Sequence, residues 1–118
     1  MNLSTEHVSD VAIVRVNEAR MMYPLLPDFS STVKNLIDAG HRKVLVDLSK
    51  VGYVDSATIG CLMDLYRQMS ATGGTFKLSG VQRRVETMLT MTGAQNFIDI
   101  QPDEALALKS FGEPRAND

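Results

Sequence analysis

The N-terminal residues carry the hydrophobic pattern of a β-hairpin. The segment VAIVRV, residues 11–16, is rich in β-branched residues, and the preceding LSTEHV alternates loosely between apolar and polar positions. Between them, Ser9 and Asp10 supply residues that favour a turn. We therefore expect two antiparallel strands at the start of the chain.

After this hairpin, helical spacing alternates with short apolar runs. A first helix is expected to begin between Pro24 and Asp28 and to end at Gly40. Its apolar stripe comprises Phe29, Val33, Leu36 and Ile37. KVLVDLS, residues 43–49, is nearly continuous in apolar residues, which is typical of a strand covered on both faces. A second helix is expected after YVDSATIG, with an inward stripe formed by Ile59, Leu62, Met63, Tyr66 and Met69.

The remaining residues continue the alternation of strands and helices. TFKLSG predicts a strand, residues 81–93 a short helix, NFIDI a last strand, and QPDEALALKSF a last helix with Pro102 near its first position. The order β-β-α-β-α-β-α-β-α predicts an α/β fold, in which a mixed, mostly parallel sheet carries an N-terminal antiparallel hairpin and is flanked by four helices. A single domain is expected over residues 1–112, with 113–118 as a frayed polar tail.

The composition narrows the choice of partner and compartment. The 118 residues have a net charge of −2 and no basic run longer than Arg83-Arg84, which argues against nucleic acid as a partner. No stretch approaches the about 20 apolar residues of a membrane helix, and the N-terminus lacks the pattern of a secretory signal. The single cysteine, Cys61, fits a reducing compartment. We expect a cytoplasmic protein with no direct membrane insertion.

The motifs of several enzyme classes are missing. There is no G-x-G-x-x-G after a strand and no G-x-x-x-x-G-K-[ST], and the two histidines, His7 and His41, lack metal-ligand spacing. The sequence has no G-x-S-x-G elbow, although a triad of Ser56, His41 and Asp47 stays open. A phospho-accepting receiver domain is disfavoured, because the segment VNEAR offers one acidic residue where Mg²⁺ needs a pair. We expect no enzyme activity, no cofactor and no metal.

Asp55 and Ser56 stand where the central apolar strand gives way to the second helix. Both residue types are good helix N-caps, worth about 1 kcal/mol, so capping alone explains the pair. The same position would also favour a phosphate on Ser56, because the helix dipole and free amide groups attract negative charge there. The neighbouring Asp55 would repel that phosphate. The residues therefore support either a plain cap or a charge switch.

The stretch VLVDLSKVGYVDSATIGCLMDLYRQMSATGGTFKLSGV resembles the central block of the STAS domain family. That family has an apolar strand, D-L-S, and then D-S-[ST]-G-[LI]-G before an amphipathic helix. The segment from Gly73 to Ile100 is similar to the family's later strand, helix and last strand, so the likeness covers about Val8 to Phe111. It implies an anti-sigma-factor antagonist, a phosphoprotein that regulates transcription through protein–protein interaction.

The resemblance also implies a site. The phosphoacceptor would be Ser56, modified by a partner anti-sigma factor that is a serine kinase using ATP, and restored by a serine phosphatase. The unphosphorylated form would bind the anti-sigma factor. The partner-binding residues that the motif implies are Asp55, Ser56, Ala57, Thr58 and Ile59. A G-x-L-D loop that the family has after its early long strand is absent here, and Asn17 and Glu18 would take its place in partner binding. Thr58 stands where the motif has glycine, so it is expected to crowd a partner and to offer a second hydroxyl.

Two other functions stay open. One is a non-switching scaffold, a STAS-like subunit of a larger regulatory or transport assembly, which would bind through exposed Met21, Met22 and Tyr23 while Ser56 acts only as a cap. In the alternative view, these three residues simply cover the first helix. The other is a small enzyme with Ser56 as nucleophile.

Overall fold

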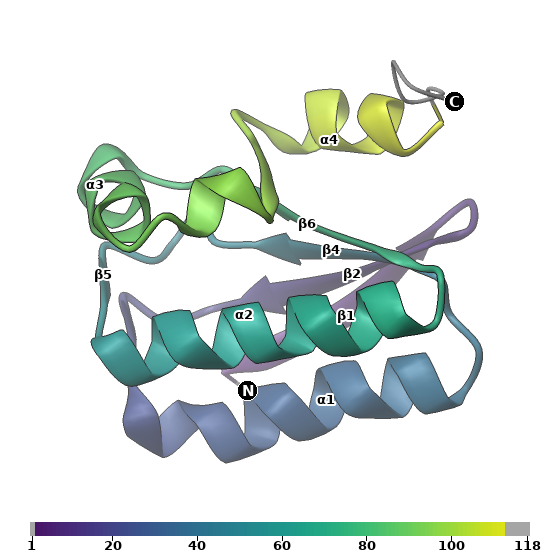
Figure 1. Cartoon of the computed structure of the whole chain (residues 1–118), viewed down its shortest axis with the longest axis horizontal. Helices are drawn as coiled ribbons and strands as arrows, with labels where there is room; N and C mark the ends of the chain where they lie inside the picture. The colour runs from purple at the N-terminus through teal and green to yellow at the C-terminus, as the bar shows by residue number, and fades with distance from the viewer. Residues whose placement is uncertain (1, 113–118) are drawn as a thin grey trace.

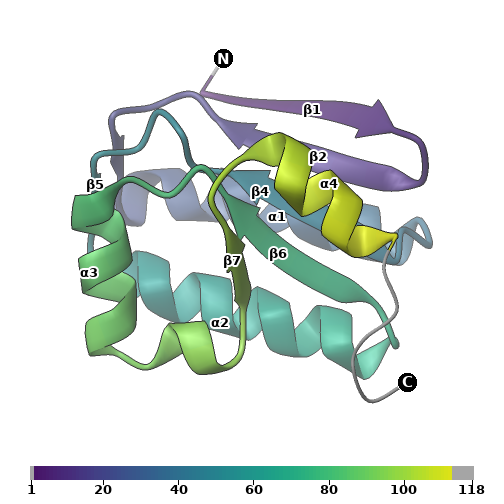
Figure 2. The ribbon, with the colours of Figure 1, turned by 90° about the horizontal axis from the view of Figure 1, so that it is seen from above.

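Five strands form one mixed sheet in the computed structural model, which describes residues 2–112 (Figures 1 and 2). The sheet has the order β1-β2-β4-β6-β7; β1 is antiparallel to β2 and the other neighbours are parallel. The strands are β1 (Leu3–Val8), β2 (Val11–Val16), β4 (Lys43–Asp47), β6 (Thr75–Ser79) and β7 (Asp99–Gln101). The predicted fold class is confirmed, and the expected tail at 113–118 lies outside the described residues.

Four α-helices surround the sheet in the predicted order. In Figure 1, α1 (Leu26–Asp38) and α2 (Ser56–Ala71) lie side by side on one face, and α4 (Glu104–Phe111) lies on the other. The third helix, α3 (Arg83–Met91), stands at the end of the sheet where β4 and β6 finish. Short 3₁₀ turns precede α1 (Tyr23–Leu25) and β7 (Ala94–Asn96).

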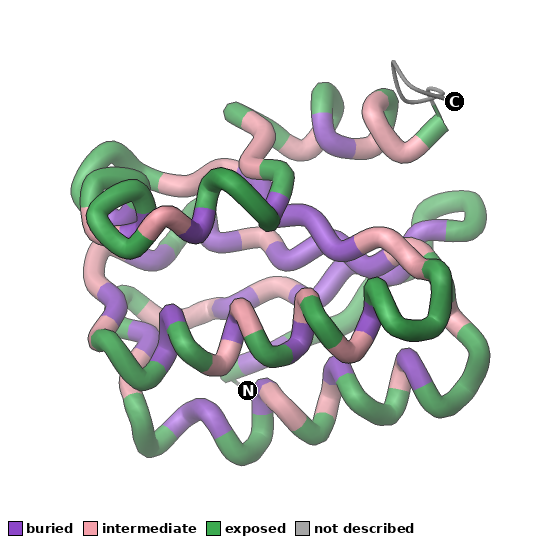
Figure 3. Tube along the Cα trace, viewed as in Figure 1, coloured by how far each residue is buried: buried purple, intermediate pink, exposed green. Residues whose placement is uncertain are grey.

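The main hydrophobic core fills the space between the sheet and the α1–α2 layer (Figure 3). Of the stripe predicted on α2, Ile59, Leu62 and Met69 are buried, and Met63 and Tyr66 are half-buried. Leu65, which was not in that stripe, is also fully buried. A second, smaller cluster under α4 comprises Val11, Ile13, Leu45 and Ala107. Because both faces of β4 are covered, its nearly continuous apolar run is explained.

The last strand and the last helix begin later than predicted. The last strand begins at Asp99 rather than at Asn96, since Ala94–Asn96 form a 3₁₀ turn. The last helix begins at Glu104, with Asp103 as its cap, so Pro102 lies outside it. In both cases a short local turn, which has no hydrophobic period of its own, replaces the end of the predicted element.

A two-stranded parallel pair was missed. β3 (Arg20–Met21) pairs with β5 (Tyr53–Val54) beside the start of α2. Two-residue strands are too short to show a hydrophobic period, so periodicity could not reveal them. Of the three residues that the scaffold hypothesis needs at the surface, Met21 is fully buried in the main core, Met22 is half-buried and Tyr23 is 69% exposed.

Within residues 2–112, no helix is both long enough and apolar enough to span a membrane.

Candidate functional site

Ser56 is the first residue of α2 and its side chain lies at the surface. The preceding residue, Asp55, is the N-cap: its backbone is extended and its Oδ1 accepts a hydrogen bond of 2.8 Å from the Thr58 amide. Ser56 is exposed and makes no side-chain hydrogen bond within the described residues. The capping prediction therefore holds for Asp55, and the Ser56 hydroxyl is left uncommitted.

Asp55 also fastens α2 to the segment that follows β3. Its Oδ2 accepts a hydrogen bond of 3.0 Å from the Tyr23 amide. Burial alone would raise the pKa of the Asp55 carboxyl, but hydrogen bonds from the side chain and backbone of Thr58 and from Tyr23 outweigh it and lower that pKa. The carboxylate is thus held ionised between two segments about 30 residues apart in the sequence.

Thr58 does not have the surface role that its place in the motif suggested. The residue is fully buried, and its Oγ1 lies 2.7 Å from the Met21 carbonyl oxygen and 2.5 Å from Asp55 Oδ1. Both neighbours are acceptors, so the single hydroxyl proton serves the interior. Thr58 therefore neither crowds the surface nor offers a second exposed hydroxyl. Ile59, only 7% exposed, packs into the core in the same way.

The first turn of α2 keeps free hydrogen-bond donors. Among its leading amides, that of Thr58 is bonded to the Asp55 carboxylate and that of Ile59 to the Asp55 carbonyl at 3.2 Å. The amides of Ser56 and Ala57 have no partner within the described residues. Free amides at the positive end of a helix dipole favour an anionic group. The geometry can therefore receive negative charge on Ser56.

Gly60 lies one turn after Ser56 on the exposed side of α2. A Cβ built on Gly60 would meet no atom within 4 Å, so the interior does not require glycine here. Glycine inside a helix costs about 1 kcal/mol relative to alanine. With exposed Ala57, Gly60 leaves a surface of small residues beside the serine.

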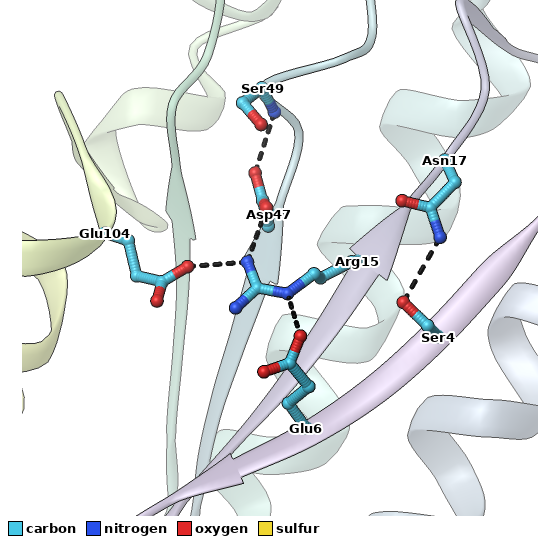
Figure 4. Close-up of polar contacts among 7 residues, drawn as sticks. All are labelled: Ser4, Glu6, Arg15, Asn17, Asp47, Ser49 and Glu104. Carbon is cyan, nitrogen blue, oxygen red and sulfur yellow. Dashed lines mark hydrogen bonds and ion pairs between the residues drawn. The ribbon is translucent and has the colours of Figure 1, made fainter.

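Asn17 and Glu18 lie at the same end of the sheet as Ser56, just before β3 turns toward α2. The Asn17 side-chain amide donates to Ser4 Oγ at 3.2 Å (Figure 4), and Glu18 is half-buried in a shallow hollow with Met22. The chain then runs alongside β5, where the Gly52 amide donates to the Ala19 carbonyl at 2.8 Å. Both residues thus border the candidate surface, and neither forms a hydrogen bond with Ser56 within the described residues.

A polar cluster on the α4 side of the sheet was not foreseen. The Arg15 guanidinium contacts three carboxylates, at 2.8 Å from Glu6, 2.8 Å from Asp47 and 2.6 Å from Glu104 (Figure 4). Asp47 also accepts a hydrogen bond of 2.9 Å from the Ser49 amide. These residues come from β1, β2, β4 and α4, so only the strand register brings them together.

The Arg15 cluster acts as a structural clamp. The hydrogen bonds that Arg15 donates, above all to Glu104, raise the pKa of Arg15 further above its ordinary value. Burial alone would raise the pKa of the Asp47 carboxyl, but hydrogen bonds from Ser49 and Arg15 lower it. The contact of Arg15 with Glu104 ties α4 to the sheet.

The residues of the open catalytic triad do not meet. His41 precedes β4 and Asp47 ends it, so the two are separated by the length of that strand, roughly 20 Å. The His41 ring instead lies near His7, with ring centroids 5.2 Å apart. Within the described residues, no group of three or more histidine, cysteine, aspartate or glutamate side chains could hold a metal ion.

Comparison with known proteins agrees with this geometry. The STAS domain model matches residues 2–107. A Thermotoga neapolitana protein, named as a TM1081 homolog among the anti-sigma factor antagonists, is 30% identical over 73 residues, which is 62% of this chain and 65% of that protein. The match therefore spans less than two thirds of that relative.

Solved structures share the fold at lower identity. The crystal structure of TM1081 from Thermotoga maritima has a TM-score of 0.85 and 22% identity, covering 94% of this chain and 95% of that one. SpoIIAA of Bacillus, described as an anti-sigma factor antagonist, matches in its unphosphorylated form with a TM-score of 0.72, 15% identity and coverage of 95% and 99%. Its phosphorylated form matches with a TM-score of 0.73, 14% identity and coverage of 92% and 98%. By its sequence over nearly its full length, and by its fold, this chain belongs to the STAS domain family.

Proposed function

We propose that this protein is a phospho-regulated binding module of the anti-sigma-factor-antagonist type. In this proposal, it binds an anti-sigma factor through the surface around Ser56 while that serine is unmodified, and releases it when Ser56 carries a phosphate. The observation that carries the proposal is an exposed, uncommitted hydroxyl at the first residue of a helix whose Asp55 cap and Thr58 are both engaged internally.

Phosphorylation of Ser56 would leave the fold intact. The new phosphate would meet the free amides of Ser56 and Ala57 and the positive end of the helix dipole, which stabilise it. The Asp55 carboxylate would repel it, so the two effects oppose each other. SpoIIAA, which shares this fold, has been solved both without and with its phosphate, which supports the expectation that such a fold tolerates the modification.

The same phosphate would disrupt a partner surface. Ala57 and Gly60 present small side chains beside Ser56, and Tyr23 is largely exposed on the adjoining segment. A partner packed closely on this surface would have to desolvate a dianion after phosphorylation. A penalty of roughly 3 kcal/mol weakens binding about a hundredfold, which is enough for a switch.

The proposal assigns the chemistry to other proteins. The anti-sigma factor would be a serine kinase that transfers phosphate from ATP to Ser56, and a separate serine phosphatase would remove it. The module itself would catalyse no reaction and need no cofactor, and it would act in the cytoplasm. Asp55, Ala57, Asn17 and Glu18 would border the contact, while Thr58 and Ile59 would support it from the interior.

The test is phosphorylation by a candidate kinase-type anti-sigma factor of the same organism. The full chain is incubated with that protein and ATP, and the modified residue is located by mass spectrometry. We expect one phosphate on Ser56 and none on the Ser56→Ala variant. Modification of other serines alone, such as the exposed Ser70 on the same helix, would contradict the proposal.

A non-switching scaffold is the second candidate, and the exposure of Tyr23 favours it. Tyr23 is 69% exposed although its backbone is fixed by Asp55, so a rigid aromatic ring stands free for a partner. In this case Tyr23→Ala weakens binding of the partner, and Ser56→Asp leaves the affinity unchanged. The opposite pattern rules the scaffold out.

A further inference from the structure

The two edges of the main sheet are protected to different degrees. The β7 edge has only three residues and is followed by Pro102. The β1 edge has six residues, five of them exposed, with no proline or lysine among them. Short strands, proline and charged side chains, lysine above all, are the usual means by which proteins prevent another strand from adding to an edge. The β1 edge is long, has no proline and no lysine, and its one carboxylate, Glu6, is bound to Arg15.

The pairing of β1 with β2 shows which backbone groups face outward. In an antiparallel pair, hydrogen-bonded and non-hydrogen-bonded residues alternate. The Asn17 amide donates to the Asn2 carbonyl at 2.8 Å, so the even-numbered residues of β1 bond to β2. The amides and carbonyls of Leu3, Thr5 and His7 therefore point away from the sheet.

A trough runs beside this open edge, between β1 and α1. Its central hollow has a volume of about 650 Å³ and is lined by Leu3 and Thr5 on the strand and by a helical stripe, Asp28, Thr32 and Asn35, on α1. A second hollow of about 350 Å³ shares Asn2, Leu25 and Asp28 with it and reaches Glu18. Beyond Thr5, the next residue on the same face, His7, lines a third hollow.

The charge of the trough selects the kind of side chain that could enter it. Asp28 is exposed, lines both the central and the second hollow, and makes no ion pair within the described residues. Glu18 lies at the same end. Arg20, also there, places its guanidinium over the Tyr53 ring at 5.4 Å. A cationic side chain would thus find a carboxylate at the wall of the hollow.

We propose that β1 is a docking edge for an extended peptide segment of a partner protein, with a lysine or arginine that pairs with Asp28. The peptide adds as a further strand through the outward backbone groups of Leu3, Thr5 and His7, and alternate side chains enter the trough. Backbone pairing provides the affinity and Asp28 the selectivity. The central hollow lies between β1 and α1 and no residue of α2 lines it, so the proposal does not depend on the phosphorylation switch; only the second hollow adjoins the Ser56 surface, at Glu18.

Selection from a random peptide library tests the proposal. Displayed peptides of about eight residues, a common strand length, are selected on the immobilised full chain, and bound peptides are mapped by amide chemical shifts. We expect enriched peptides to share a basic residue at one position and to shift the amides of Leu3, Thr5 and His7. Ser56→Glu should enrich the same peptides.

Matched variants separate backbone pairing from side-chain contact. Thr5→Pro removes an outward amide that β2 does not use, so the fold should survive and peptide affinity should fall at least about tenfold. Thr5→Val keeps the amide and should keep the affinity. Asp28→Lys, which leaves the strand untouched, should weaken basic peptides about tenfold or select acidic ones instead.

Several results would overturn the proposal. One is the absence of peptides that prefer the native chain to both Thr5→Pro and Asp28→Lys. A second is a Thr5→Val variant that loses as much peptide affinity as Thr5→Pro does. A third is a native dimer in sedimentation experiments that Thr5→Pro disperses, since a second copy of the chain would then occupy the edge.

Discussion

The N-termini of α2 and α4 are built on the same cap but are used differently. Asp55 and Asp103 both have extended backbones, and each accepts a hydrogen bond of 2.8 Å from the amide three residues on. The next residue differs. Glu104 in α4 is bound to Arg15 at 2.6 Å, whereas Ser56 in α2 is exposed and unbonded. Capping therefore explains the aspartates, and only the residue after the cap distinguishes the candidate site.

The two caps also differ in how much they hold together. Asp103 serves its own helix, while Asp55 in addition accepts from Tyr23 and contacts the buried Thr58 hydroxyl. The start of α2 is thus fixed to the neighbouring segment without the help of Ser56. A charge can be added to Ser56 without breaking an existing contact, which is what a switch on a stable fold needs.

The largest expected effect on stability comes from removing the two cap residues, Asp55 and Asp103, one at a time. Asp103→Ala should lower the free energy of unfolding by about 1 kcal/mol, the usual value for a lost cap. Asp55→Ala should lower it by about 2 kcal/mol, because the Tyr23 amide also loses its acceptor. Urea denaturation measures both, with Asp55→Asn as the control that keeps an acceptor. Equal losses would mean that the additional contacts of Asp55 contribute nothing.

Substituting the residue that follows each cap should change the free energy of unfolding by unequal amounts. Glu104→Ser breaks a half-exposed ion pair with Arg15 and should lower the free energy of unfolding by about 1 kcal/mol. Ser56→Glu breaks no contact and should change it by less than about 0.5 kcal/mol. Thermal unfolding of the two variants compares them. A large loss in Ser56→Glu would show that the hydroxyl is needed for the fold.

Gly60→Ala should separate stability from binding. Alanine fills open space on a helix, so the free energy of unfolding should rise by about 0.5–1 kcal/mol. The added methyl group would disturb the surface of small residues beside Ser56, so affinity for the anti-sigma factor should fall. Gly112→Ala at the end of α4 is a control that should leave affinity unchanged. Unchanged affinity in Gly60→Ala would place the partner elsewhere.

The smallest expected effect is the contribution of Asp55, at the start of α2, to the pH dependence of stability. The pKa of Asp55 is lowered in the folded state below its ordinary value of 3.8, so the unfolded chain binds its proton first as the pH falls. Its contribution to stability is complete above about pH 4 and is lost below it. Asp55→Asn should therefore flatten the loss of stability measured by urea unfolding from pH 5 downward. An identical slope would show that Asp55 is not held ionised.

The fold was predictable wherever a hydrophobic period was long. The stripes of α1 and α2 and the apolar run of β4 each span several residues, so periodicity identified them. The β3–β5 pair has two residues on each side and shows no period, so the sequence left open whether Met21 is exposed or buried. Local chemistry likewise predicted a cap at Asp55 or Ser56, and the structure assigns it to Asp55.

The rest of the site depended on contacts between distant segments. That Thr58 turns inward follows from the Met21 carbonyl 37 residues away, and the Arg15 cluster follows from the strand register and the position of α4. Neither contact has a signal in local spacing. The motif identified Ser56 as a candidate, and only the structure separates the exposed members of the motif from the buried ones.

The affinity of the anti-sigma factor for the two states of Ser56 tests the central claim most directly. The chain is prepared with and without phosphate on Ser56, and both forms are titrated with the partner by calorimetry after their thermal midpoints have been shown to agree. We predict binding about a hundredfold weaker for the phosphorylated form, because the partner must desolvate the phosphate. Equal affinities of the two folded forms would contradict the account.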